Sequence, residues 1–402
     1  MKLPDGFTPR RIHASGRMAR RLLATLPLLG LAATLLLSPR IGLADHDTIP
    51  DPAPRSTHNK LSAYSTLDRN AITVSGLSSG GFFAHQFHIA YSKLVNGAAI
   101  IAGGPFGCVE NIPNPYWPLW TLDRLSAALV VCTHYYGDRF YGLRPAGPKV
   151  DDSIEFIRKA ARDRTVDDRA NLADDRVWLF AGAQDEIVPP SIVKTLKAVY
   201  ERLGISGERL RLEERSANHG MPVSAFLGES RLPKRSCGEH KPPYIIECGY
   251  EAAERLLAHL YPGTFEETPK DPHQNGSLMP FDQTEFSGDE ATSMSGVGYL
   301  YFPTQCREQN CRLHIAFHGC RQNVDSGDAD RIHDDFIRDA GYNRWAAANN
   351  IVVLYPQATQ STINPNACWD FWGYTGTEYY GQKGKQMRAV KGMVDRLLGQ
   401  QN

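Results

Sequence analysis

Short apolar runs, rich in β-branched and aromatic residues, recur along the chain and alternate with segments of helical length and amphipathic pattern. Such runs predict strands, and their alternation with helices predicts βαβ units and a parallel sheet. The expected strands cover 71–75, 97–102, 176–181 and 210–214, and the expected helices cover 80–94, 192–203 and 250–260.

A proline-rich loop follows at 262–276, and its composition alone would also suit a linker between domains. Beyond it, three further strands are expected at 298–303, 312–317 and 351–355, with helices at 332–349 and 386–398. These elements could complete the sheet begun at residue 71. No internal repeat is visible.

The sequence Gly76-Leu77-Ser78-Ser79-Gly80 stands between an expected strand and an expected helix. A Gly-x-Ser-x-Gly string at a strand-to-helix turn is typical of a nucleophile elbow, in which a tight backbone exposes the serine oxygen and the next amide faces the developing oxyanion. We therefore expect Ser78 to be a nucleophile. The structural alternative is a plain glycine turn.

An acid and a base follow Ser78 in the order used by α/β-hydrolases. Asp185 comes just after the strand at 176–181, where catalytic side chains of open α/β sheets gather. Glu186 is its nearest rival. His219 follows the strand at 210–214, and we expect it to be the general base.

Other histidines have weaker placements. His85 and His88 lie on the helix after the elbow, where they would pack or face solvent, and His134 and His314 have no motif around them.

A His318-Gly319-Cys320 turn follows the strand at 312–317. A His-Gly turn of this kind usually supplies the second oxyanion amide from a loop that precedes the nucleophile, whereas here it comes about 240 residues after Ser78. The helix at 386–398 would likewise fit best just ahead of the strand at 71. The order predicts a circularly permuted α/β-hydrolase with a mostly parallel central sheet flanked by helices, in one domain.

The first segment is rich in arginine and leads into an apolar run at 22–37 that ends near small residues at 42–44. This pattern predicts a secretory signal peptide over 1–44, with an uncleaved anchor as the alternative. We expect an extended lead-in over 45–70 and a single catalytic domain over 71–402.

The formal net charge is zero, with 44 basic and 44 acidic residues. Because residues 1–44 hold seven Lys or Arg and one Asp, the remainder is mildly acidic. It has no basic stripe, which argues against nucleic acid or an anionic membrane as partner. No metal-binding motif is present, and no metal or cofactor is expected.

Eight cysteines form an even set, and disulfides are the default for an exported chain. Sequence proximity suggests the pairs 108 with 132, 237 with 248, 306 with 311 and 320 with 368, out of roughly 105 possible pairings. Cys320 could also be read as a thiol nucleophile, although a disulfide fits an exported protein better. A bridge to Cys368 would hold the His-Gly loop rigid.

At these motifs the chain resembles the short-chain poly(3-hydroxyalkanoate) (PHB) depolymerases of the permuted type, from about Ala71 to the C-terminus. The likeness also rests on Cys248-Gly249-Tyr250 before a helix and on the stretch 366–372. It implies Ser78 as nucleophile, His219 as base, Asp185 as its orienting acid, and the amides of Ser79 and Cys320 as oxyanion hole. The implied substrate is a water-insoluble polyester of 3-hydroxybutyrate.

Many extracellular relatives carry a linker and a separate substrate-binding domain, which this chain does not show. The resemblance then implies a single-domain, periplasmic or extracellular enzyme that adsorbs to polymer through surface apolar residues. The candidates for this contact are Trp117, Trp120, Trp369 and Trp372. The oligomeric state stays open.

Two other functions fit the same residues. One is a secreted carboxylesterase for smaller or plant-derived esters, such as feruloyl or acetyl esters. The other is a non-catalytic polyester-binding protein that has kept the scaffold. Polymer hydrolysis and labelling of Ser78 by a fluorophosphonate would distinguish the three.

Overall fold

A computed structural model describes residues 58–110, 124–134, 147–224, 235–263, 265–288, 292–325 and 334–400. These residues belong to one compact unit. The expected signal peptide at 1–44 and two of the candidate substrate-binding residues, Trp117 and Trp120, lie outside the described residues.

An eight-stranded sheet forms the centre of the fold, in the order β4-β3-β2-β1-β9-β10-β8-β7. Its strands are β1 (Leu67–Leu77), β2 (Gly97–Ile101), β3 (Arg176–Gly182), β4 (Leu210–Arg215), β7 (Gly276–Asp282), β8 (Val297–Pro303), β9 (Cys311–Phe317) and β10 (Ile351–Tyr355). The first six strands in this order, β4, β3, β2, β1, β9 and β10, run parallel to one another. Strand β8 runs antiparallel to both β10 and β7. A second, two-stranded sheet pairs β5 (Met221–Val223) with β6 (Ile245–Glu247).

Strand β1 lies in the middle of the large sheet, between β2 and β9. Gly76 at its carboxyl end is in register with Ile100 of β2 and with Phe317 of β9. The late strands thus complete the sheet begun by the early ones, as the permuted order predicts, and the α/β-hydrolase fold is confirmed. The proline-rich loop before β7 is not a domain linker, because β7 belongs to the same sheet.

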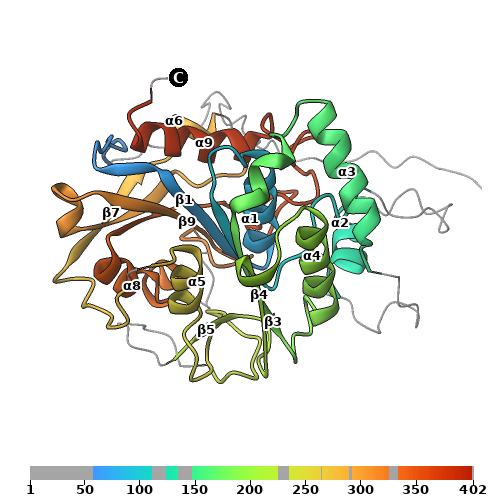
Figure 1. Cartoon of the computed structure of the whole chain (residues 1–402), viewed down its shortest axis with the longest axis horizontal. Helices are drawn as coiled ribbons and strands as arrows, with labels where there is room; N and C mark the ends of the chain where they lie inside the picture. Colours follow the sequence, from blue (N-terminus) through green and yellow to red (C-terminus); the bar gives the residue numbers. More distant parts are fainter. Residues whose placement is uncertain are drawn as a thin grey trace, which may run out of the picture. The chain divides into compact units, whose positions relative to one another are not determined.

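Helices cover the sheet. Their bounds are α1 (Ser79–Ala90), α2 (Arg124–Ala127), α3 (Val150–Arg162), α4 (Pro190–Arg202), α5 (Ala252–Leu260), α6 (Thr284–Ser287), α7 (Asp335–Asp339), α8 (Tyr342–Asn349) and α9 (Lys385–Leu397). Short 3₁₀ segments occur at Arg169–Asp174, Gly207–Arg209 and Thr304–Arg307, and a π-helical turn at Ala128–Cys132. Figure 1 shows α1, α3 and α4 on one side of the sheet and α5 and α8 on the other, in agreement with their contacts.

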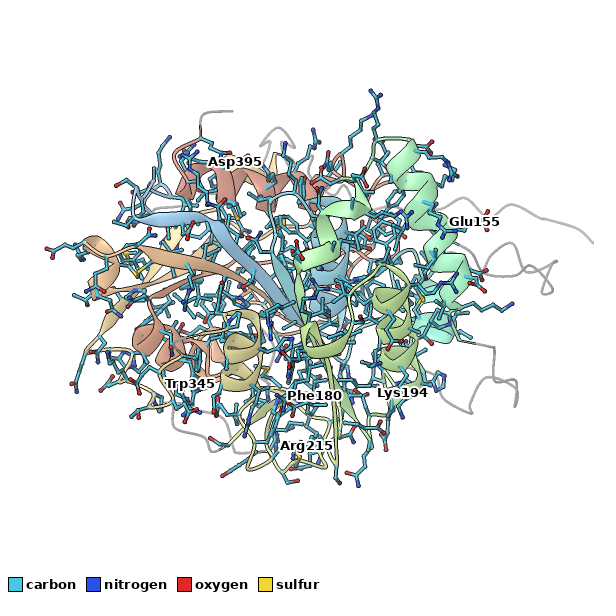
Figure 2. The ribbon with its side chains drawn as sticks, viewed as in Figure 1. Glu155, Phe180, Lys194, Arg215, Trp345 and Asp395 are labelled. Carbon is cyan, nitrogen blue, oxygen red and sulfur yellow. A yellow bond between two sulfur atoms is a disulfide. The ribbon has the colours of Figure 1, made fainter. Side chains whose placement is uncertain are left out.

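Burial follows from this layering. Every residue of β2 is buried, and its sequence is a small, apolar run without alternation, as expected of a parallel strand covered on both faces. Helix α4 buries Ile192, Leu196 and Val199 at helical spacing against the sheet. Figure 2 shows Phe180 of β3 among the interior side chains, whereas Glu155 and Lys194 lie at the periphery.

Several elements differ from the sequence-based expectations. Strand β1 begins at Leu67, so the expected lead-in 45–70 ends four residues too late. Helix α3 and the edge strand β7 were not expected. The single helix expected at 332–349 is two helices, because Gly341 between them has a φ of 88° that no helix interior adopts.

Four disulfides tie the described residues together, and they are the four pairs that sequence proximity suggested. Such a set is typical of an exported protein. Within the described ranges, no helix combines the length and the apolar character that a membrane span requires.

Candidate active site

Ser78 occupies the turn between β1 and α1. Its backbone has φ 57° and ψ −122°, a conformation that an L-residue adopts only under strain, and its amide donates to the carbonyl of Ile101 at 2.9 Å. The flanking glycines are required sterically: a methyl group on Gly76 would lie 2.1 Å from the Gly80 carbonyl oxygen, and one on Gly80 would lie 2.3 Å from that of His318. This is the elbow geometry that exposes a serine side chain.

Asp185 and His219 are hydrogen-bonded to each other. The Nδ1 atom of His219 lies 2.9 Å and 3.1 Å from the two carboxylate oxygens of Asp185, and both side chains are buried. Asp185 also accepts the backbone amides of Ile187 and Val188 at 2.9 and 2.8 Å, which fixes the carboxylate. Since a carboxylate only accepts, the imidazole proton lies on Nδ1 and leaves Nε2 as the free base.

The loops that carry these two residues adjoin each other at the carboxyl edge of the sheet. The amide of Gln184 donates to the carbonyl of Ala217 at 3.0 Å. Asn218 accepts the amide of His219 through Oδ1 at 2.7 Å and donates through Nδ2 to the Gly238 carbonyl at 3.1 Å. Asn218 thus fixes the histidine backbone, a role that its place in a polar loop sequence did not reveal.

The His318-Gly319-Cys320 turn lies directly beside Ser78. It follows β9, the neighbour of β1, and a methyl group on Gly319 would lie 3.5 Å from Ser78 Cβ. On the other side, Ser79 is the first residue of α1, so its amide has no partner within the helix. Backbone donors from two different elements therefore flank the serine, the arrangement an oxyanion needs.

Ser78 and His219 make no hydrogen bond to each other in the part of the chain that the structure describes. Nucleophile-to-base contacts are often long in the absence of substrate and tighten only when substrate binds. The side chain of Ser78 is partly exposed, whereas the histidine and the aspartate are enclosed.

His318 holds the turn in place. Its Nδ1 donates to the carbonyl of Gly319 at 2.7 Å, and its Nε2 accepts the amide of Ala358 at 3.1 Å. Burial lowers the pKa of His318 to about 4, so the ring stays neutral and keeps this tautomer.

A further histidine adjoins His219. The ring of His240 meets that of His219 edge to face, with centroids 5.3 Å apart. Burial, and then the nearby His219, lower its pKa to about 4. Sequence reasoning missed His240, because it lies in an irregular segment without a motif.

Three further histidines, His85, His88 and His314, have structural contacts. His85 and His88 pack rather than face solvent: both are fully buried and contact the Tyr200 hydroxyl, and His88 also pairs with Asp175 at 2.9 Å. His314 is buried between the hydroxyls of Thr73 and Ser75.

The structure buries the two tryptophans, among the candidates for substrate contact, that it describes. The prediction that Trp369 contacts polymer is wrong, because its side chain is fully buried against Phe83 and Phe317, beside His318. Trp372 is 5% exposed and packs on Phe371, which leaves little of its ring for a surface contact. Among the described residues, the large apolar side chain that stands out by exposure is Ile363, at 57%.

A cavity of about 660 Å³ lies at the opposite edge of the sheet, at the amino ends of β9 and β10. Its lining includes Phe265, Arg312 and Asn349. Among the described residues, no cluster of three His, Cys, Asp or Glu side chains could hold a metal ion.

Known proteins resemble the chain over most of its length. It is 34% identical over 336 residues to a poly(3-hydroxybutyrate) depolymerase of Delftia acidovorans, covering 82% of this chain and 60% of that protein. It is 31% identical over 346 residues to a polyhydroxybutyrate depolymerase of Talaromyces funiculosus, covering 83% of this chain and 91% of that protein. No family model matches the chain.

Solved structures agree with these relatives. A PHB depolymerase complexed with an R3HB trimer has a TM-score of 0.71 and 28% identity, and the PHB depolymerase from Penicillium funiculosum has a TM-score of 0.69 and 28% identity. Each match covers 85% of this chain and the whole of the other. The chain spans 60% of the bacterial relative but 91% of the fungal one, and it belongs to the polyhydroxybutyrate depolymerase family.

Proposed function

We propose that this protein hydrolyses the ester bonds of poly(3-hydroxybutyrate), or of a related short-chain polyhydroxyalkanoate, through an acyl-enzyme. The observation that carries the proposal is the buried Asp185–His219 pair at the same sheet edge as the strained Ser78 elbow. The relatives' activity and the R3HB trimer bound by the solved neighbour support the substrate class.

The reaction follows from the hydrogen bonding of the site. Neutral His219 takes the Ser78 hydroxyl proton on Nε2 as Ser78 Oγ bonds to the ester carbonyl carbon. Asp185 holds the ring in the required tautomer and stabilises the imidazolium. The amides of Ser79 and Cys320 bind the oxyanion of the tetrahedral intermediate.

Collapse of this intermediate breaks the ester C–O bond, and His219 returns the proton to the leaving hydroxyl end of the polymer. Water then attacks the acyl-enzyme, with His219 again as the base, which releases the carboxylic acid end of the other fragment and regenerates Ser78. No step of this cycle calls for a cofactor.

Ser78→Ala tests the proposal. The folded variant should lose hydrolysis of amorphous polymer granules and of short aryl esters, and it should fail to react with a fluorophosphonate that labels the wild type. Near-wild-type hydrolysis by folded Ser78→Ala would overturn the assignment of the nucleophile.

The same assays separate the other two functions. A secreted carboxylesterase would cleave aryl esters but leave polymer granules intact. A non-catalytic binder would adsorb to granules without labelling by the fluorophosphonate.

We also propose that the chain from β1 onward, residues 67–402, acts as one catalytic domain. We further propose that a leader over 1–44 is removed and that the protein works in the periplasm or outside the cell. The four disulfides support export, because disulfides form and persist in oxidising compartments. Amino-terminal sequencing of the protein recovered from each compartment tests both points.

A further inference from the structure

The side chain of Gln322 joins two loops of the site. It is 1% exposed, and its Oε1 accepts the amide of Gly319 at 2.8 Å while its Nε2 donates to the carbonyl of Pro243 at 2.9 Å. A buried primary amide with both ends satisfied holds its partners at a fixed separation, because breaking either contact strands a polar group away from water.

The segment on the far side of Gln322 leads to the base. The carbonyl of Tyr244 accepts the amide of Met221, two residues after His219, at 2.8 Å. The Tyr244 ring packs against His240, which itself meets His219 edge to face. Gln322 therefore connects the oxyanion turn to the loop that bears the base.

On the near side, Gln322 and His318 together fix two successive peptide planes. Gln322 accepts the N–H of the 318–319 peptide, and His318 donates to the carbonyl of the 319–320 peptide. Because a peptide is planar and trans, its N–H points away from its carbonyl, so anchoring the Gly319 carbonyl also orients the Cys320 amide.

We propose that Gln322 is a positioning residue that, together with His318, orients the Cys320 amide toward the oxyanion and holds it in register with His219. The inference rests on the oxyanion role proposed above for Cys320. By occupying the Gly319 amide, Gln322 selects which of two adjacent amides remains available to the substrate.

The test compares Gln322→Met, which keeps the length of the side chain without its hydrogen bonds, with the wild type. Sites are first counted by fluorophosphonate titration, so that kcat refers to folded, labelled protein. On a soluble aryl butyrate, kcat should fall on the order of 100-fold, the cost of misplacing a catalytic group by about 1 Å, while KM changes little. The inhibition constant of a trifluoromethyl ketone, which forms an oxyanion on the serine, should rise by the same factor as kcat/KM falls.

Asn349→Leu is the matched control. Asn349 is a buried amide bonded on both sides, to Glu266 and Trp345, at the opposite edge of the sheet from Ser78. The Asn349→Leu variant should have a lower free energy of unfolding, as Gln322→Met should, but its kcat per titrated site should equal that of the wild type. Equal kcat in Gln322→Met and in the wild type would overturn the inference.

Gln322→Glu gives a second readout that a purely structural role would not produce. A neutral carboxyl can still accept from Gly319 and donate to Pro243, whereas its anion cannot donate and places negative charge beside the oxyanion. The ratio of its kcat to that of the wild type should fall at least about tenfold between about pH 5 and about pH 9. A flat ratio contradicts the proposal. A wild type that neither labels nor hydrolyses the ester would instead refute the proposed function.

Discussion

The Nδ1 atom of His219 lies 2.9 Å from Oδ2 of Asp185, and both side chains are buried. Replacement of Asp185 by Asn should lower kcat by roughly 10³- to 10⁴-fold near neutral pH, because the amide would favour the wrong tautomer of His219. Steady-state kinetics on a soluble aryl ester measure the loss, with circular dichroism to verify folding.

Glu186→Gln is the matched control for this prediction. Glu186 is adjacent in sequence but exposed, so its neutralisation should leave kcat within about twofold of the wild type. The reverse pattern, with loss only in Glu186→Gln, would reassign the acid.

The Cys320–Cys368 disulfide ties the oxyanion turn to the segment before Trp369, closing a separation of 48 residues. Replacing both cysteines by Ser should lower the free energy of unfolding by about 2–4 kcal/mol and, because the turn loosens, lower kcat by roughly tenfold. Cys306 lies in the 3₁₀ segment before β9, and Cys311 is the first residue of β9, five residues later. Replacing both should lower the free energy of unfolding less and leave kcat nearly unchanged. Denaturant titration measures the free energy of unfolding of both double variants, and steady-state kinetics measure their kcat.

Buried histidines make the fold sensitive to acid. Burial lowers the pKa of His314 to about 3, against about 6.5 for an exposed histidine, so between these values the unfolded chain binds a proton that the folded chain does not. Stability is therefore lost as pH falls below about 6.5. At about pH 4.5 this one residue accounts for about 2–3 kcal/mol.

His314→Gln isolates that contribution. Its free energy of unfolding should change by about 2–3 kcal/mol less than that of the wild type between about pH 7.5 and about pH 4.5. Parallel pH dependences in the two proteins would show that His314 does not titrate on unfolding.

Ile363 exposes most of its side chain on the segment that adjoins the oxyanion turn, where the amide of Arg321 donates to the carbonyl of Asn366 at 2.7 Å. Ile363→Asp should weaken adsorption to polymer by about 1 kcal/mol, roughly fivefold, and slow granule hydrolysis while leaving kcat/KM on a soluble ester unchanged. Ile363→Leu should behave like the wild type. Equal adsorption of all three proteins would remove Ile363 from the polymer contact.

Unlike Ile363, Trp369 should affect stability and not polymer adsorption, because it packs inside the protein against Phe83 and Phe317. Trp369→Leu should lower the free energy of unfolding by about 2–4 kcal/mol and lower polymer and soluble-ester activity in equal proportion. A selective loss of polymer activity would restore the surface role that its sequence context suggested.

Much of the fold could be predicted from the local pattern of apolar residues and glycines. Strands β2 and β3 are nearly continuous apolar runs, and the glycines around Ser78 indicate a tight turn. The permuted order could also be inferred, because a His-Gly turn after the serine makes sense only if β9 returns beside β1. Strand β7 could not be predicted from the sequence, because it lies at the sheet edge, contains Pro280 and buries mainly Phe281. Its sequence therefore has no periodic pattern of apolar residues.

The site was only partly predictable. Ser78, Asp185 and His219 stand at strand ends where the sequence marks them. Asn218 and His240 lie in irregular segments without a motif, and Gln322 contacts Pro243, 79 residues away in the chain. The burial of Trp369 also depends on packing, since an aromatic residue in an irregular segment can face either the core or solvent.

The pairing of β1 with β9 also dictates when the site can form. The two strands are separated by more than 200 residues, so β1 gains its second neighbour only after most of the chain has been synthesised. A chain that ended before residue 311 would carry the serine, the histidine and the aspartate but lack the Cys320 amide. The proposed oxyanion site therefore draws on segments far apart in the chain, and it cannot assemble before β9 and the turn that follows it have been synthesised.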